Sequence, residues 1–198
     1  MPNTEEEWKT IEAGFNTKRN FPTCYGSLNG KHVEIRAPSN SGSEFFNYKK
    51  TSSIILLAIV DHNYCFSYIN VGASGNASDG GVFKNCSIHE QLENGLLLED
   101  GVIVGDTAFP LKTYLLKPYP GVNLSAEEKI FNYRLSRARR IVENAFGILV
   151  SRFRIFEKAI PTYLNTVDAI ISATCALHNW LRKKSKSYIT ATCIDRED

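Results

Sequence analysis

Three acidic side chains stand at positions where together they could hold a metal ion. Asp106 directly follows the apolar segment Val102–Val104, at the end of what should be a buried strand. Asp79 lies in a glycine-rich stretch before a helical segment, Glu143 borders the apolar side of a long helical segment, and Asn29 is a polar break near the start of the first strand. Carboxylate and carbonyl oxygens are the preferred ligands of Mg²⁺ and Mn²⁺. Two such ions can activate water and stabilise the leaving oxygen in phosphodiester hydrolysis.

Each of these residues also has an ordinary structural explanation. Asp106 could cap the turn that follows it, and Asp79 could cap the next helix. Asn29 precedes a glycine, and that pair is typical of tight turns. Glu143 could form a surface ion pair with an arginine three or four positions earlier. Taken singly the residues leave both explanations open, whereas the combination of the three carboxylates favours a metal site.

The pattern of apolar residues predicts the elements that would position these side chains. Apolar runs and alternation predict strands at Leu28–Ala37, Ser53–Val60, Phe66–Val71 and Val102–Val104. Helical spacing predicts a helical lead-in within residues 1–20 and helices over Val82–Leu92, from Ser125 onward, and over about Val167–Lys184. Ser125 and Glu128 match a capping box. Three antiparallel strands followed by a strand–helix unit predict an α/β fold, with a mixed sheet flanked by helices.

Length and composition predict a single domain of ordinary soluble composition. We expect a helical lead-in at 1–20, the domain itself at 21–185 and a frayed tail at 186–198, in a chain of 198 residues that is 43% apolar. The longest apolar run, Ile54–Val60, is too short to span a bilayer, so no membrane association is expected. An acidic N-terminus is unlike a signal peptide. Five scattered cysteines without a CxxC pair argue against a disulfide framework or a zinc knuckle and favour a reducing compartment.

The net charge of +2 hides an uneven distribution. Residues 1–111 carry a net charge of −5, and residues 112–158 carry +6. Arginines of the long helical segment contribute much of this basic block, which is a candidate surface for a polyanion. On charge alone, a solvated helix face is the commoner explanation.

The histidines give weaker signals. His32 follows Lys31 and could approach a phosphate, although a strand histidine more often packs or faces water. His178 is expected to pack with Asn179 in the last helix rather than bind a ligand, and His62 is expected at the surface.

Ordered motifs along most of the chain resemble one known family. The most specific are Val104–Leu111 (VGDTAFPL), Phe131–Arg139 (FNYRLSRAR) and Val142–Gly147 (VENAFG), accompanied by Leu28–Val33, Phe46–Lys49, Ser78–Phe83 and Leu177–Asn179. From Phe15 to Leu181 the sequence resembles the PIF/Harbinger superfamily of DDE transposases, including the domesticated Harbinger transposase-derived nucleases.

The resemblance implies an RNase H-like fold and a divalent-metal-dependent endonuclease that hydrolyses phosphodiester bonds of DNA with Mg²⁺ or Mn²⁺. It implies catalytic, metal-binding carboxylates at Asp79, Asp106 and Glu143, and a fourth metal ligand at Asn29. The family has aspartate at that fourth position, within an Asp-Gly-Lys-His pattern. Asparagine offers a carbonyl oxygen but no negative charge, so we expect impaired metal binding and impaired activity.

The resemblance also implies that the partner is DNA. It implies the nucleus as the compartment, with the cytoplasm as a further location. Lys31, Arg134, Arg137 and Arg140 are expected to contact backbone phosphates without reading bases. Family members usually carry a further N-terminal region, so the chain is expected to be a fragment or a reduced copy. Sequence-specific recognition would then require a separate helix-turn-helix module or partner protein.

The alternative is a non-catalytic, domesticated nuclear protein that binds DNA or another protein. Asn29 favours this alternative, whereas intact Asp79, Asp106 and Glu143 favour the enzyme, because a long-abandoned site should lose several ligands. A decaying copy of the element without a selected role is a third, weaker possibility.

Overall fold

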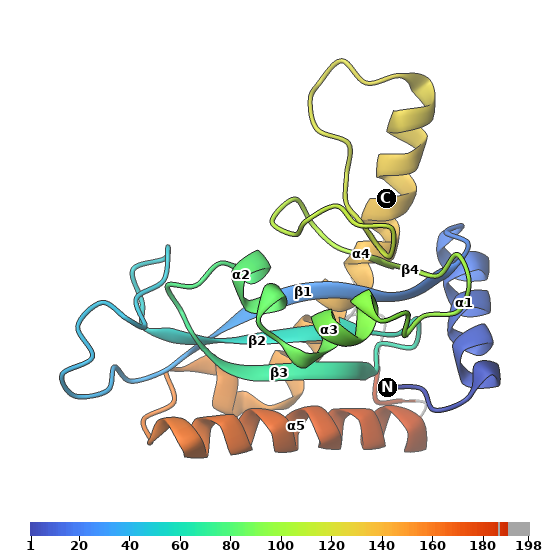
Figure 1. Ribbon diagram of the computed structural model, residues 1–198. Coiled ribbons are helices and arrows are strands. Elements are labelled where there is room, and N and C mark those ends of the chain that lie inside the picture. The colour runs from blue at the N-terminus through green and yellow to red at the C-terminus, as the bar shows by residue number, and fades with distance from the viewer. Residues whose placement is uncertain (186, 190–198) are drawn as a thin grey trace.

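A five-stranded mixed sheet forms the centre of the computed structural model, which describes residues 1–185 and 187–189 (Figure 1). Its strands are β1 (Cys24–Glu34), β2 (Ser53–Val60), β3 (Phe66–Ser74), β4 (Val102–Val104) and β5 (Leu115–Leu116). They lie in the order β3-β2-β1-β4-β5, with β1 antiparallel to β2, β2 antiparallel to β3, and β4 parallel to β1 and to β5. The predicted α/β architecture, a mixed sheet of the RNase H-like kind flanked by helices, is confirmed.

Helices cover both faces of this sheet. They are α1 (Glu5–Arg19), α2 (Asp79–Lys84), α3 (Ser87–Glu93), α4 (Ala126–Arg152), the 3₁₀ turn η1 (Arg154–Glu157) and α5 (Leu164–Lys184). Buried residues of α2 and α3 share one apolar cluster, and those of α1, α4 and α5 share the other. Among the described helices, none is both long and apolar enough to cross a lipid bilayer.

Strand β2 is the part of the sheet that both layers bury. Ile54, Leu56, Ala58 and Val60 belong to the cluster of α1, α4 and α5, while Ile55, Leu57 and Ile59 belong to the cluster of α2 and α3. Side chains alternate between the two faces of a strand, so a strand covered on both faces must be apolar throughout. This explains the uninterrupted apolar run of the sequence.

The long helix α4 begins with the predicted capping box. The Ser125 hydroxyl accepts a hydrogen bond from the Glu128 backbone N–H at 3.2 Å, and the Glu128 carboxylate accepts one from the Ser125 N–H at 2.8 Å. The helix packs on β1 and β2 through its second half, whereas its first half and the loop before it rise away from the sheet (Figure 1). Ile130 and Tyr133 on that first half are more than half exposed.

The prediction of one helix over Val82–Leu92 is wrong, because the segment forms two short helices, α2 and α3. Cys86 between them has extended backbone angles (φ −94°, ψ 155°) and serves as the N-cap of α3. The Asn85 side-chain amide donates to the Gly81 carbonyl at 3.1 Å, and the Cys86 thiol donates to the Phe83 carbonyl. These side chains satisfy carbonyl groups that a continuing helix would have used, which ends α2.

Other boundaries differ because tertiary pairing extends or creates elements. β1 begins at Cys24 and ends at Glu34 rather than spanning Leu28–Ala37, since its first residues pair with β4. β3 continues to Ser74, α5 begins at Leu164, and β5 was not predicted. β5 exists because the N–H groups of Ile103 and Gly105 find carbonyl partners in the 114–116 segment. The predicted frayed tail, 186–198, lies outside the described residues except for 187–189.

Candidate active site

The pairing of β1 with β4 sets Asn29 and Asp106 at the same end of the sheet. The two strands run parallel, with Ser27 opposite Val104. Asn29 follows Ser27 by two residues, and Asp106 follows Val104 by two residues, so both lie at the same level. Asn29 is itself paired with Ala58 of β2, in the middle of a strand. The alternative that Asn29 belongs to a tight turn is therefore wrong.

Asp79, the first residue of α2, lies directly over the backbone of Gly30. A Cβ atom at residue 30 would stand 2.2 Å from Oδ1 of Asp79, a distance that no real side chain tolerates. Ser78 is the N-cap of α2 and accepts a hydrogen bond from the Gly81 N–H at 3.2 Å. The glycine after Asn29 thus allows a carboxylate from α2 to reach β1.

A second glycine holds α2 against the loop that carries Asp106. A Cβ atom at Gly80 would stand 2.5 Å from the backbone oxygen of Ala108. The Ala108 N–H in turn donates to Oδ1 of Asp106 at 2.9 Å. Asp106 therefore caps its turn, which confirms one of the two explanations of this residue. Its second carboxylate oxygen accepts no hydrogen bond from the described residues.

Asp79 and Asp106 are close enough to repel each other. Burial raises the pKa of the Asp79 carboxyl, the negative charge of Asp106 raises it further, and a hydrogen bond from the Gly30 N–H lowers it. Neither carboxylate forms an ion pair within the described part of the chain. A partly buried pair of like charges without a cation is an electrostatic cost that a bound cation would remove.

Glu143 approaches from the opposite face of the sheet. The Ser27 hydroxyl donates to the backbone oxygen of Arg139 at 3.0 Å, so α4 crosses β1 one turn before Glu143. Ser27 and Asn29 point to the same face, because side chains alternate along a strand. Glu143 is bound by Arg139 through an N–O contact of 2.5 Å, which is the i,i+4 ion pair that the sequence left open.

A profile of known sequences matches this region of the chain. The family described as DDE superfamily endonuclease matches residues 28–179, a span that contains Asn29, Asp79, Asp106 and Glu143. The chain belongs to this family.

Similar proteins support the same family, which confirms the family predicted from the motifs. "Protein ALP1-like" of Arabidopsis thaliana is 29% identical over 184 residues, covering 85% of this chain and 45% of the relative. "Putative nuclease HARBI1" of Homo sapiens is 27% identical over 182 residues, covering 90% of this chain and 52% of the relative. The chain thus spans about half the length of these relatives. No solved structure matches it.

The donor set of this site fits a divalent cation in part. Asp79 and Asp106 provide hard oxygen ligands, and Asn29 provides a carbonyl oxygen that accepts a hydrogen bond from the Gly30 N–H at 2.9 Å. Within residues 1–185 and 187–189, no three acidic, histidine or cysteine side chains are already gathered at metal-binding spacing. Glu143 would have to leave Arg139 to complete such a set.

The four basic residues predicted to contact DNA do not lie on one surface. Arg140 lies three positions before Glu143 and shares its side of α4, whereas Arg134 lies nine positions before Glu143 and points the opposite way. Arg134 lines an apolar groove with Phe21 and Phe131. Arg137 reaches the Lys18 carbonyl of α1 at 3.3 Å.

Lys31 follows the carboxylate region along β1 and is largely covered by neighbouring atoms. Burial lowers the pKa of its ammonium group, the nearby Lys49 lowers it further, and Glu34 opposes both effects. Lys49 lies in the turn before β2, and no local sequence pattern marks it as functional, because the pairing of β1 with β2 is what brings the turn toward Lys31.

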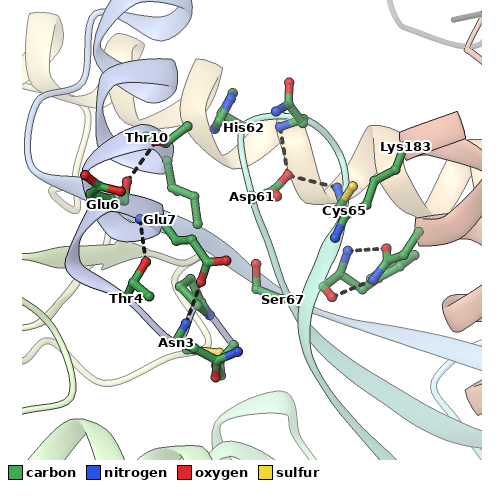
Figure 2. Close-up of a pocket in the computed structure, with 16 residues that line it drawn as sticks. Asn3, Thr4, Glu6, Glu7, Thr10, Asp61, His62, Cys65, Ser67 and Lys183 are labelled. Carbon is green, nitrogen blue, oxygen red and sulfur yellow. Dashed lines mark hydrogen bonds between the residues drawn. The ribbon is translucent and has the colours of Figure 1, made fainter.

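A cavity of about 680 Å³ lies elsewhere, between the start of α1, the turn joining β2 to β3 and the end of α5 (Figure 2). Asp61 in this turn accepts hydrogen bonds from the N–H groups of Asn63 at 2.8 Å and Cys65 at 2.9 Å. Its carboxylate is therefore used to shape the turn. His62 is 7% exposed and packs against Gly14 of α1, so the prediction that it lies at the surface is wrong.

His178 has the packing role that was predicted. It is fully buried, and its ring nitrogens bond to the Tyr64 carbonyl and to the Tyr188 hydroxyl. Asn179 bonds to both backbone groups of Phe66, at 2.8 Å and 2.9 Å. This pair holds α5 to the sheet.

Gly30→Ala is expected to displace Asp79 at little cost in stability. The new Cβ would overlap the end of a side chain, which can rotate away, rather than backbone. We expect the unfolding free energy to change by less than about 1.5 kcal/mol, and the rise in Tm on adding Mn²⁺ to be lost. Thermal unfolding with and without Mn²⁺ measures both.

Gly147→Ala is the matched control, since nothing lies within 4 Å of its Cβ position on α4. It should stabilise the protein by about 0.4–1 kcal/mol and leave the effect of Mn²⁺ unchanged. An unchanged Mn²⁺ effect in Gly30→Ala would show that Asp79 is not positioned as described.

Asp79→Asn is expected to raise the Tm at pH 7 in the absence of divalent ions. The native state binds the Asp79 proton more tightly than the unfolded chain does, so this carboxyl contributes stability at low pH that is lost as the pH rises through its folded pKa. The difference in Tm between the variant and the natural chain should therefore shrink as the pH falls through that pKa.

The exposed Asp100 gives a control, Asp100→Asn, that removes the same charge outside the site. Saturating Mn²⁺ should reverse the order and leave the natural chain more stable than Asp79→Asn. A variant that is less stable than the natural chain at pH 7 without metal would contradict the repulsion between Asp79 and Asp106.

Proposed function

We propose that this DDE endonuclease domain hydrolyses phosphodiester bonds of DNA with Mg²⁺ or Mn²⁺, and that Asn29 impairs its activity. One observation carries the proposal: Asp79 and Asp106 meet at the end of β1 and β4 as unpaired, mutually repelling carboxylates. Structural carboxylates are normally paired, whereas sites that bind cations hold like charges together.

The proposed metal ligands are Asp79, Asp106 and Glu143, with the carbonyl oxygen of Asn29. A divalent cation bound there would supply charge neutralisation at the phosphate and a more acidic water. The remaining work falls to the chain itself. The Gly30 N–H holds the side-chain oxygen of Asn29 at 2.9 Å, the Ala108 N–H orients Asp106, and Arg139 restrains Glu143 until a ligand competes for it.

DNA is the proposed substrate, in the nucleus. Lys31 and Arg140 lie on the elements that carry Asn29 and Glu143, which supports contacts of these two residues with backbone phosphates. Arg134 and Arg137 would then contact DNA only where it extends past α4 toward α1. A separate helix-turn-helix partner for sequence recognition is part of the proposal.

A non-catalytic role is the second candidate. Two observations favour it: Asn29 removes a charge from the proposed site, and Glu143 is held by Arg139. A protein of this kind would retain DNA binding while lacking metal binding.

Two measurements on the purified natural chain and its Asn29→Asp variant distinguish the impaired nuclease from the non-catalytic protein. They are calorimetric titration with Mn²⁺ and relaxation of supercoiled plasmid. Weak Mn²⁺ binding that Asn29→Asp strengthens would support the impaired nuclease. If neither chain releases or absorbs heat and neither nicks plasmid, the proposed nuclease is wrong and the non-catalytic role stands.

A further inference from the structure

The turn at Asn47–Thr51, between β1 and β2, is held in shape by one buried side chain. Asn47 is 4% exposed, and its Oδ1 accepts hydrogen bonds from the N–H groups of Lys49 at 2.9 Å and Thr51 at 3.2 Å. Its amide donates to the hydroxyls of Thr51 at 3.0 Å and Ser53 at 2.9 Å. The position of Lys49 is therefore fixed by the fold and needs no ligand to form.

The same network sets the hydrogen-bonding state of His32. The Ser53 hydroxyl is fully buried, receives a hydrogen bond from Asn47 and lies 2.8 Å from Nδ1 of His32. We assign the hydroxyl proton to this contact with Nδ1, which gives the neutral ring its proton on Nε2. Burial lowers the pKa of His32, and the charges of Lys49 and Lys31 lower it further, which keeps the ring neutral at pH 7.

Two ammonium groups act on this histidine, Lys49 from the turn and Lys31 from the preceding position of β1. Among the described residues, neither Lys31 nor Lys49 forms an ion pair or a side-chain hydrogen bond. The Lys49 ammonium lies 5.6 Å from the centre of the Tyr48 ring, and that ring meets His32 edge-on at 5.5 Å. Tyr48 is 78% exposed, so the cluster is open to solvent. The Lys49 ammonium and the His32 ring thus lie beside the same exposed tyrosine, whereas Lys31 faces the other side of β1 and is acted on by Glu34.

We propose that His32 and Lys49, the basic turn cluster, bind a backbone phosphate of DNA adjacent to the phosphodiester at the carboxylate site. The proposal rests on the proposed function for the identity of the anion. His32 follows Gly30, over which the Asp79 carboxylate lies, by two residues, or about 6.6 Å of strand, and faces the same side of β1, so one DNA strand can contact the cluster and the carboxylate site. A phosphate accepts several hydrogen bonds and suits point charges such as lysine.

Lys49→Gln is expected to weaken binding of a short DNA duplex about fivefold to tenfold at ~0.1 M salt and to lower the salt slope, log K against log [salt], by about 1. The measurement is fluorescence anisotropy in EDTA, across a series of salt concentrations. Lys50→Gln is the matched control, because Lys50 is the next residue of the same turn, is exposed and does not act on His32. It should change the affinity less than twofold.

Equal losses in the two variants, or no loss in Lys49→Gln, would overturn the basic turn cluster, as would the absence of any DNA binding by the natural chain. Because binding is measured without divalent ions, this result is independent of whether the natural chain binds Mn²⁺ or nicks plasmid. The proposed nuclease can therefore fail while the phosphate site stands, and the reverse also holds.

Discussion

Asn29→Asp is expected to tighten Mn²⁺ binding by at least about tenfold to a hundredfold and to produce nicking of supercoiled plasmid. Residues that merely support metal ligands already change metal affinity about 10–100-fold, and this substitution adds a charged ligand itself. Asn29 lies level with Asp106 at the end of the sheet, on the face that α4 and Glu143 cover, so the new carboxylate would add a charged ligand there. Calorimetry and plasmid relaxation measure the two gains.

The same substitution has a consequence for stability that does not depend on activity. Without metal, a third negative charge beside Asp79 and Asp106 should lower the Tm below that of the natural chain. Saturating Mn²⁺ should raise the Tm of the variant more than that of the natural chain, because a ligand stabilises the state that binds it more tightly.

Asn123→Asp is the matched control, since it makes the same change in an exposed loop. It should leave Mn²⁺ affinity and nicking as they are in the natural chain. If Asn29→Asp neither lowers the Tm in EDTA nor raises Mn²⁺ affinity, residue 29 is not part of a metal site.

Asp106→Asn, made in the Asn29→Asp chain, should reduce nicking by on the order of 10³-fold or more, as expected when one member of a catalytic unit is removed. Asparagine keeps a carbonyl oxygen for the Ala108 N–H, so the turn after β4 and the fold should survive. The loss would then arise from the missing charge rather than from unfolding. Plasmid relaxation gives the rate, and thermal unfolding verifies the fold.

Binding of a DNA duplex in EDTA should remain in the Asp106→Asn variant, because the basic turn cluster is unaltered. Asp100→Asn in the same background controls for the change in net charge and should nick normally. Nicking that persists at the parental rate in Asp106→Asn would exclude Asp106 as a catalytic residue.

The sequence by itself determined the architecture and most of the elements. The bounds of β2 and β4 were predicted correctly, because an uninterrupted apolar run has few alternatives to a strand covered on both faces. The start of α4 was also predicted, since its capping box is a local signal that needs no distant partner. The family followed from ordered motifs, which the DDE superfamily match confirms.

The tertiary structure decided between the structural and the functional explanation of each candidate site residue. Asn-Gly at 29–30 had the pattern of a turn, but pairing with β2 makes it part of a strand, and its glycine serves the approach of Asp79. Asp106 and Glu143 both form the contacts with nearby residues that the sequence suggested, a hydrogen bond from the Ala108 N–H and an ion pair with Arg139. The repulsion between Asp79 and Asp106, by contrast, arises only when α2 is folded over β1.

Features that depend on contacts between distant segments were beyond the sequence. β5 forms from two residues because β4 offers it unpaired backbone groups, and Lys49 joins Lys31 because β2 returns beside β1. Local signals such as caps, apolar runs and turn residues act within a few positions of the chain. Close approach, burial and the interaction of charges depend on spatial distance, which only the folded chain defines.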